Sequence, residues 1–387
     1  MSSTADHELL LRAALLDREP ALAAWDAWKV AKDLAAVDKA SRRLLPLLYR
    51  NLERHAVDDP RMKSLATIHA EARRKNERLL DRVGPMLRAF EAAGIRTLVL
   101  KGIALATLHY RDIGARPMAD VDILVPVGQA RDAMALLRAR GWRHAQAGHP
   151  ETHIPYCHSA NFRDPSRLQL DLHWHVMIQC CQAEADAAFW AAAREVEIAQ
   201  APTRVLSPAD QLLHVCVHGM AWRHRPRLIR WIPDALTIIS AEGQQLDWSR
   251  LAEQAEARRL GHTIRCAMDY LVERFDAPIP STALARLRST RTTALERLEH
   301  RTCSRGTSDD LLGVLVPRWF AFRRLPIVSR RGGRAVAFVD FLRHSWKLER
   351  RREVPAIVLK KALRRGVRMP ADRLARWLAA GSRPRGS

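Results

Sequence analysis

The stretch GARPMADVDILV, residues Gly114 to Val125, combines a predicted strand with two acidic side chains. Its second half is short and apolar apart from Asp120 and Asp122, which is typical of a buried β-strand. Residues two apart on a strand project from the same face, so we expect the two carboxylates to lie side by side. Buried carboxylates are rarely unpaired. The stretch therefore predicts that a cation lies against this strand.

A second acidic strand is predicted at RLQLDLHWHV, residues 167–176, where apolar residues alternate with Asp171, His173 and His175. If the two strands are neighbours, Asp171 joins Asp120 and Asp122. A single DxD pair most often marks a turn or a helix cap, whereas three acids on two strands favour chemistry. Three carboxylates can hold two Mg²⁺ ions, with Mn²⁺ as a substitute, in a site typical of phosphoryl or nucleotidyl transfer.

The rest of the sequence predicts an α+β fold. IRTLVLKG, residues 95–102, reads as a buried strand, and HIPYCHSANFRD, residues 153–164, should pair antiparallel with residues 167–176. Ser207 and Pro208 are expected to begin a helix. We expect four parts: an N-terminal helical region (1–80), a sheet-containing core (81–200), a helical domain that completes the cleft (201–320) and a basic, mostly helical tail (321–387).

Charge is distributed unevenly along the chain. The whole chain has 64 Lys and Arg against 42 Asp and Glu, a net charge of +22. Residues 321–387 alone have 19 basic and four acidic residues. Such a tail suits nucleic acid or another acidic surface, although an arginine-rich solvated face would look the same. A loop or hinge is expected at residues 323–334 and disorder at the final PRGS.

Other features indicate a cytoplasmic protein. No run approaches the roughly 20 apolar residues of a membrane-spanning helix, and the first residues lack the pattern of a signal peptide. The six cysteines form no CxxC pair, so we expect reduced thiols rather than disulfides or a zinc knuckle.

Five motifs follow one another between about Thr97 and Arg250: LVLKG, RPMADVD, LDLHWHV, LSPADQLLHVCVH and RWIPDAL. Together they resemble a bacterial family of uncharacterised nucleotidyltransferase-like proteins in the DNA polymerase β-type nucleotidyltransferase superfamily. The resemblance implies a polymerase β-like mixed sheet flanked by helices. It also implies that Asp120, Asp122 and Asp171 are catalytic Mg²⁺ ligands, with Asp171 as the base.

The expected nucleotide-binding residues surround these acids. Gly102 stands where the superfamily usually has a Gly-Ser pair that grips phosphates, and Lys101 could supply by charge what the missing serine supplies by hydrogen bonding. Arg116 is placed to meet a phosphate or to brace the acids. His173 could orient a metal-bound group or be purely structural. His218 is expected to contact the base, a phosphate or the acceptor.

Some positions allow two interpretations. Asp234 could pair with Arg230 one turn earlier, or it could cap the cleft from the helical domain. His214 and His218 lie four apart on one helix face, but no third ligand follows, so we expect no zinc there. The tryptophans of the helical domain are expected in its core: Trp222, Trp231 and Trp248.

Three functions fit this pattern. The first is an Mg²⁺-dependent nucleotidyltransferase that moves a nucleoside monophosphate from a nucleoside triphosphate (NTP) to a hydroxyl, amine or phosphate of a small molecule, peptide natural product, protein or RNA. The second is a catalytically weak protein of the same fold that binds nucleic acid or an acidic surface through residues 321–387. The third is a phosphotransferase using the same metal site, although no P-loop or kinase motif is present. All three acids are retained, which favours the first.

Overall fold

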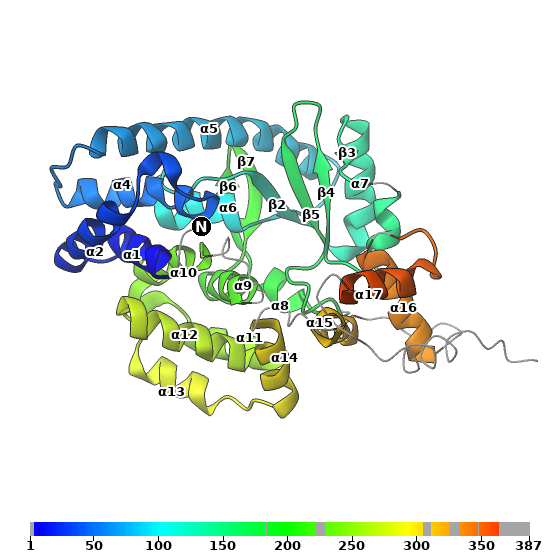
Figure 1. The fold of residues 1–387 in the computed structure, drawn as a ribbon. Coiled ribbons are helices and arrows are strands. Elements are labelled where there is room, and N and C mark those ends of the chain that lie inside the picture. The colour runs from blue at the N-terminus through cyan, green and yellow to red at the C-terminus, as the bar shows by residue number, and fades with distance from the viewer. Residues whose placement is uncertain are drawn as a thin grey trace, which may run out of the picture.

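A computed structural model describes residues 4–146, 148–182, 184–220, 229–304, 311–325, 333–346 and 348–363. Within these residues one seven-stranded mixed sheet lies at the centre of the fold, in the order β3-β4-β5-β2-β1-β7-β6 (Figure 1). The expected α+β class, with a mixed sheet flanked by helices, is confirmed. The strands are β1 Leu98–Leu100, β2 Asp120–Leu124, β3 Arg143–His144, β4 Ser159–Arg163, β5 Gln169–His173, β6 Arg194–Ile198 and β7 Ala201–Val205.

The two acidic strands lie next to each other in this sheet. β2 and β5 are parallel neighbours, and their register puts Asp122 opposite Asp171. β4 pairs antiparallel with β5, as predicted. β1 is shorter than the expected strand because Lys101 has a φ of +41° and begins α6, Lys101–Leu105. Since Leu100 lies opposite Asp122, the strand ends beside the acids, and Lys101 follows at that point.

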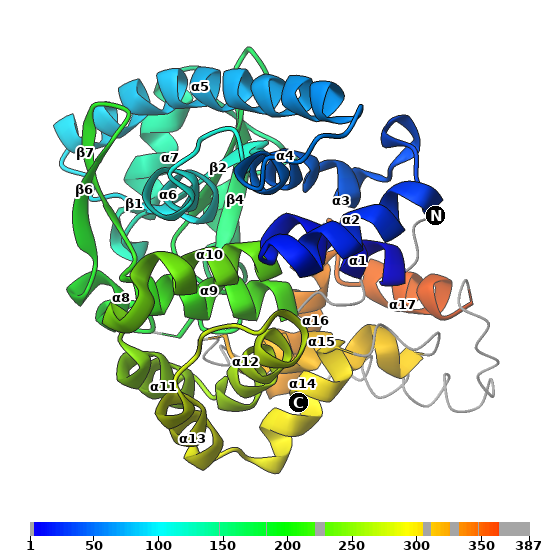
Figure 2. The same ribbon diagram turned by 90° about the vertical axis from the view of Figure 1, so that its left-hand side faces the viewer.

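Side chains alternate between the two faces of the sheet. Val121 and Ile123 pack into a core covered by α5 (Met62–Ala92) and α7 (Ala130–Ala139). Leu124 belongs to the core on the opposite face, which α9 (Pro208–Met220) and α10 (Trp231–Glu242) cover. Figure 2 shows α5 on one side of the sheet and α9 and α10 on the other. The acids are thus held at the mouth of a sheet whose two faces are both covered.

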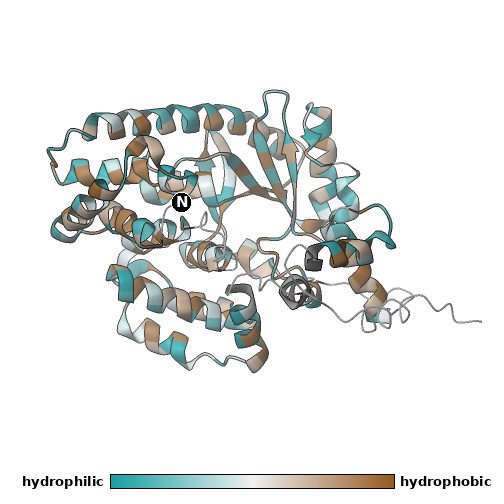
Figure 3. Ribbon diagram, in the orientation of Figure 1, coloured by the Kyte–Doolittle hydropathy of each residue, from teal (hydrophilic) through white to brown (hydrophobic). Residues whose placement is uncertain are grey.

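The remaining helices extend this arrangement at both ends of the chain. Hydrophobic and hydrophilic residues alternate along them, as expected for helices with one buried face (Figure 3). The N-terminal group is α1 Thr4–Leu15, α2 Arg18–Ala31, α3 Lys39–Arg42 and α4 Leu45–Arg54. The later helices are α8 Ala187–Ala191, α11 Trp248–Ala257, α12 Gly261–Phe275, α13 Ser281–Ser289, α14 Ala294–Ser304, α15 Leu311–Arg323, α16 Gly333–Ser345 and α17 Glu353–Leu363.

The expected division into four parts cuts through elements of the fold. α5 runs across residue 80, and the β6–β7 hairpin runs across residue 200, so the sheet reaches Val205. The helical parts before and after the sheet lie where the sequence predicts them, but the division itself stays a prediction.

The described part of the basic tail is folded. α15, α16 and α17 share a small core formed by Cys181, Phe322, Leu325, Phe341, Leu342, Val354 and Val358. His344 of α16 stacks on Tyr156, with 4.1 Å between ring centroids. Most of the expected hinge, residues 326–332, and the end of the chain from residue 364 lie outside the described residues. Among the helices that are described, none has the length and apolarity needed to cross a membrane.

Candidate active site

The three acids lie together at one end of the sheet. Asp122 of β2 and Asp171 of β5 are opposite each other on parallel strands, whose backbones run about 4.8 Å apart. Asp120 precedes Asp122 by two residues and so projects from the same face. Asp120 is exposed, whereas Asp122 is buried. All three line one open cleft, as the strand pattern predicts.

Two basic side chains hold this group of acids together. Lys101 Nζ lies 3.2 Å from Asp122 Oδ1. His173 Nε2 lies 3.1 Å from Asp122 Oδ1 and 3.3 Å from Asp171 Oδ2. His173 Nδ1 lies 3.3 Å from the carbonyl oxygen of His175. Both ring nitrogens of His173 therefore face acceptors and both carry protons, which makes the ring an imidazolium.

This arrangement favours the structural interpretation of His173. Its side chain is completely buried beneath the acids, and both of its nitrogens are donors. A ring that is protonated on both nitrogens has no lone pair with which to ligate a metal. Its role in the described structure is to hold Asp122 and Asp171 in position. The sequence allowed this structural role, but no pattern in the strand distinguished it from the alternative, in which His173 orients a metal-bound group.

Charge coupling within the site shifts its pKa values. Burial alone would lower the pKa of His173, but Asp171 and the hydrogen bonds to both acids raise it to about 9. Burial raises the pKa of Asp122, but Lys101 and His173 more than reverse this and hold it below its usual value. Desolvation in the cleft and repulsion from Asp122 raise the pKa of Asp120. Asp120, the exposed carboxylate, therefore loses its proton at a higher pH than Asp122.

The acids fit a divalent cation. Asp171 Oδ1 is buried and has no hydrogen-bond partner among the described residues, which leaves a charged acceptor unsatisfied. Ligand atoms of Asp122, Asp171 and His173 lie within 4.8 Å of one another, and with His173 protonated the ligands there are carboxylates. Asp120 adds a third carboxylate from the cleft side. Oxygen ligands at an open cleft are those that Mg²⁺ and Mn²⁺ prefer.

Two arginines that were not among the predicted site residues also line the cleft. The cleft has a volume of about 250 Å³ and contains Arg43, from the end of α3, and Arg230, from the start of α10. Neither side chain makes a hydrogen bond or salt bridge within the described part of the chain. Burial and the charge of Arg116 lower the pKa of Arg230 to about 10, which still leaves it charged at neutral pH. Two cations thus face three acids across one cleft.

Arg116 forms a buried ion pair with Asp234. Its Nε and Nη2 donate to the two carboxylate oxygens of Asp234, at 2.7 and 2.8 Å. Tyr110 donates to Asp234 Oδ1 at 2.9 Å. Arg116 also lines the cleft of the acids, so its expected contact with a phosphate stays a prediction. Asp234 makes no side-chain hydrogen bond to Arg230. The pair instead joins the loop before β2 to α10, two walls of the cleft.

The other predicted positions differ in their access to the cleft. Gly102 and His218 line it. His214 lies one turn deeper and is buried. Burial lowers the pKa of His218 to about 4, so its ring is neutral at pH 7. Trp231 and Trp248 pack in or against the core, as predicted, and Trp222 lies outside the described residues.

A buried asparagine of α5 holds the loop that carries Arg116. Asn76 is fully buried. Its side-chain nitrogen donates to the carbonyl oxygens of Ile113 and Arg116, and its oxygen accepts from the backbone N–H of Met118 at 3.1 Å. Asparagine is a poor helix former, so its place inside a long amphipathic helix was an available signal. Arg43 had no local signal, and Arg230 was predicted only as a possible partner of Asp234, because their shared position in the cleft depends on how distant helices pack.

Comparison with known proteins places the chain in a family. A crystal structure of an antigenic nucleotidyltransferase-like protein from Paracoccidioides brasiliensis is similar at 14% identity and a TM-score of 0.35, over 56% of this chain and 95% of that chain. No curated protein matches the chain. The model of a family described as uncharacterised nucleotidyltransferase matches residues 34–276, more than half of the chain. The chain therefore belongs to this family of uncharacterised nucleotidyltransferases.

Proposed function

We propose that the cleft transfers a nucleoside monophosphate from an NTP to an acceptor hydroxyl, amine or phosphate, with Mg²⁺ or Mn²⁺ held by Asp120, Asp122 and Asp171. The observation that carries the proposal is the unsatisfied, buried Asp171 Oδ1 beside two further carboxylates. Bound divalent ions would supply neutralisation of the triphosphate and activation of the attacking group. The likeness to the family supports the reaction class, and the cleft supports the residues.

Each protein group has a distinct part in the proposed reaction. Arg43 and Arg230 bind the β- and γ-phosphates, because they are charged, face the cleft and have no hydrogen-bonded partner among the described residues. His218 is neutral and contacts the base or the acceptor. Lys101 holds Asp122 until the NTP arrives and then adds charge at the α-phosphate. Gly102 lets the backbone approach, since a Cβ there would lie 3.3 Å from Arg116 Nη1.

The chemistry balances without a further reactant. The acceptor oxygen or nitrogen forms a bond to the α-phosphorus, and the bond between the α-phosphorus and the bridging oxygen breaks. Pyrophosphate leaves between the two arginines. The acceptor's proton passes to the carboxylate of Asp171, which lines the cleft. Positioning and charge neutralisation supply most of the rate enhancement in such transfers.

Isotopic labels distinguish this reaction from its alternatives. The chain is incubated with Mg²⁺, candidate small-molecule and peptide acceptors, and NTP labelled in either the α- or the γ-phosphate. We expect label from the α-phosphate in the acceptor and pyrophosphate as the second product, both lost in Asp171→Asn. Transfer of the γ-label would identify a phosphotransferase instead.

A binding protein without turnover is the alternative that one observation favours. Lys101 supplies a positive charge to Asp122, with 3.2 Å between Nζ and Oδ1, which is part of the neutralisation that an ion would otherwise provide. If the cleft binds no NTP, and RNA binding depends steeply on salt through residues 321–387, that function replaces the one proposed.

A further inference from the structure

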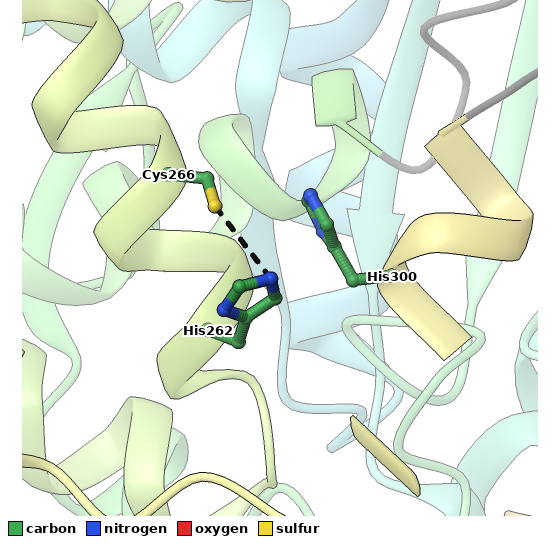
Figure 4. A group of neighbouring side chains, drawn as sticks. All are labelled: His262, Cys266 and His300. Atoms are coloured by element: carbon green, nitrogen blue, oxygen red, sulfur yellow. Dashed lines mark hydrogen bonds between the residues drawn. The ribbon is translucent and has the colours of Figure 1, made fainter. Parts of the chain in front are cut away.

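A second group of metal-binding side chains lies in the C-terminal helices. His262 and Cys266 are four residues apart on α12, and therefore on one face of it. His300 comes from α14. Ligand atoms of the three lie within 4.8 Å of one another, and Cys266 Sγ lies 3.8 Å from His262 Nε2. Figure 4 shows the three side chains converging on one point between the helices.

We propose that His262, Cys266 and His300 form a Zn²⁺ site that joins α12 to α14. One thiolate and two imidazoles are a donor set that zinc binds in tetrahedral geometry, with water in the fourth position. Softer donors of this kind do not suit Mg²⁺, so the two metal sites of the chain are chemically distinct. None of the three residues lines the cleft of the acids.

Neighbouring side chains already orient two of the ligands. Thr263 Oγ1 lies 3.1 Å from His300 Nδ1, and such a partner fixes the orientation of a ligating imidazole ring. Glu296 of α14 accepts the backbone N–H of His262 at 2.7 Å, so the start of α12 is tied to α14 without an ion. A cavity of about 40 Å³ borders Thr263, Glu296 and His300, large enough for a water molecule.

Arg265 opposes metal binding at His262. Its Nη2 lies 2.9 Å from His262 Nδ1. Because a guanidinium only donates, this bond places the ring proton on Nε2, toward Cys266. Zinc at Nε2 requires the other tautomer, so Arg265 must turn away when the ion binds. Its positive charge also repels a cation. Removing this side chain should therefore strengthen the site, whereas removing a ligand weakens it.

Zinc titration of the full chain tests the proposal. The protein is stripped of metal with a chelator, titrated with Zn²⁺ alone and assayed for bound zinc, and Co²⁺ is used to detect thiolate ligation by its near-ultraviolet charge-transfer absorption. We expect one zinc per chain and this absorption in wild type. Cys266→Ser and His300→Gln should each weaken binding by roughly 100-fold or more, and Arg265→Met should tighten it.

Two controls keep the outcome specific. Cys157→Ser removes another partly buried thiol and should leave zinc binding unchanged. Asp120→Asn/Asp122→Asn removes the carboxylate site and should also leave it unchanged. Circular dichroism of each ion-free variant verifies that it is folded. Wild type that binds no zinc, or binding that survives both Cys266→Ser and His300→Gln, would overturn the proposal.

Discussion

The buried pair of Arg116 and Asp234 provides a quantitative test of how the cleft is built. Arg116 is 7% exposed and Asp234 is 5% exposed, and two hydrogen bonds of 2.7 and 2.8 Å join them. Asp234→Asn keeps the shape but leaves the arginine charge buried without its counter-charge. Losing one partner of a buried pair costs about 3–5 kcal/mol. Because the asparagine oxygen still accepts one bond, we expect about 3 kcal/mol.

Equilibrium urea unfolding at pH 7 measures this cost, and a double variant separates charge from packing. Arg116→Met/Asp234→Leu replaces both charges by apolar groups of similar size, which is often nearly neutral. It should therefore recover most of the loss. Asp17→Asn makes the same chemical change at a salt bridge whose acid is 94% exposed, and surface pairs contribute about 0–1 kcal/mol.

Two outcomes would refute this reasoning. If Asp234→Asn lost no more free energy of unfolding than Asp17→Asn, the pair would not hold the cleft walls together. The double variant is also compared with Arg116→Met and Asp234→Leu measured singly. If the double variant lost as much free energy of unfolding as the sum of those two, the cost would come from lost packing rather than from an unpaired charge.

Three further predictions follow from single contacts. Gly84→Ala puts a Cβ 2.4 Å from the carbonyl oxygen of Ala199, so it should lower the free energy of unfolding by about 1–3 kcal/mol. Gly128→Ala should change this free energy little, because a Cβ there meets nothing within 4 Å. Equal urea midpoints for the two variants would contradict this prediction. Burial raises the pKa of Asp112, but a histidine and an arginine of α5 and a backbone N–H reverse this and lower it to about 2. The stability that the Asp112 carboxylate contributes is present above pH 4 and is lost as pH falls toward 2. Asp112→Asn should therefore cost about 2 kcal/mol of unfolding free energy at pH 7 and less at pH 2. A difference between wild type and Asp112→Asn that does not depend on pH would show that the carboxylate charge is not involved. Arg230→Gln should weaken Mg²⁺-dependent NTP binding about tenfold, which calorimetry measures. It should not lower the free energy of unfolding in urea, because the Arg230 side chain has no hydrogen-bonded partner among the described residues.

Local sequence patterns predicted the sheet and the acids well, since each depends on short-range rules. Alternation placed Asp120 and Asp122 on one face, and the parallel register of β2 with β5 brings Asp171 beside them. The helix predicted from Ser207 and Pro208 begins at Pro208, and Ser207 Oγ accepts the backbone N–H of Asp210. These features need no knowledge of how helices pack.

Long-range contacts are where prediction from sequence failed. The rule of one helical turn favoured Arg230 as the partner of Asp234, but Arg116 lies 118 residues away along the chain and makes the bonds. Only the packing of α10 against the loop before β2 brings them together. His262 and His300 likewise come together only through the packing of α12 on α14.

Calorimetric titration of the four NTPs is the most direct test of the central claim. Each NTP is titrated into wild type and into Asp120→Asn/Asp122→Asn, with and without Mg²⁺, after circular dichroism has shown that both proteins are folded. We predict that one NTP binds wild type at least tenfold more tightly with Mg²⁺ and that this difference is lost in the double variant. Wild type that binds no NTP, or binding that is unchanged by Mg²⁺ or by the loss of both acids, would contradict the account.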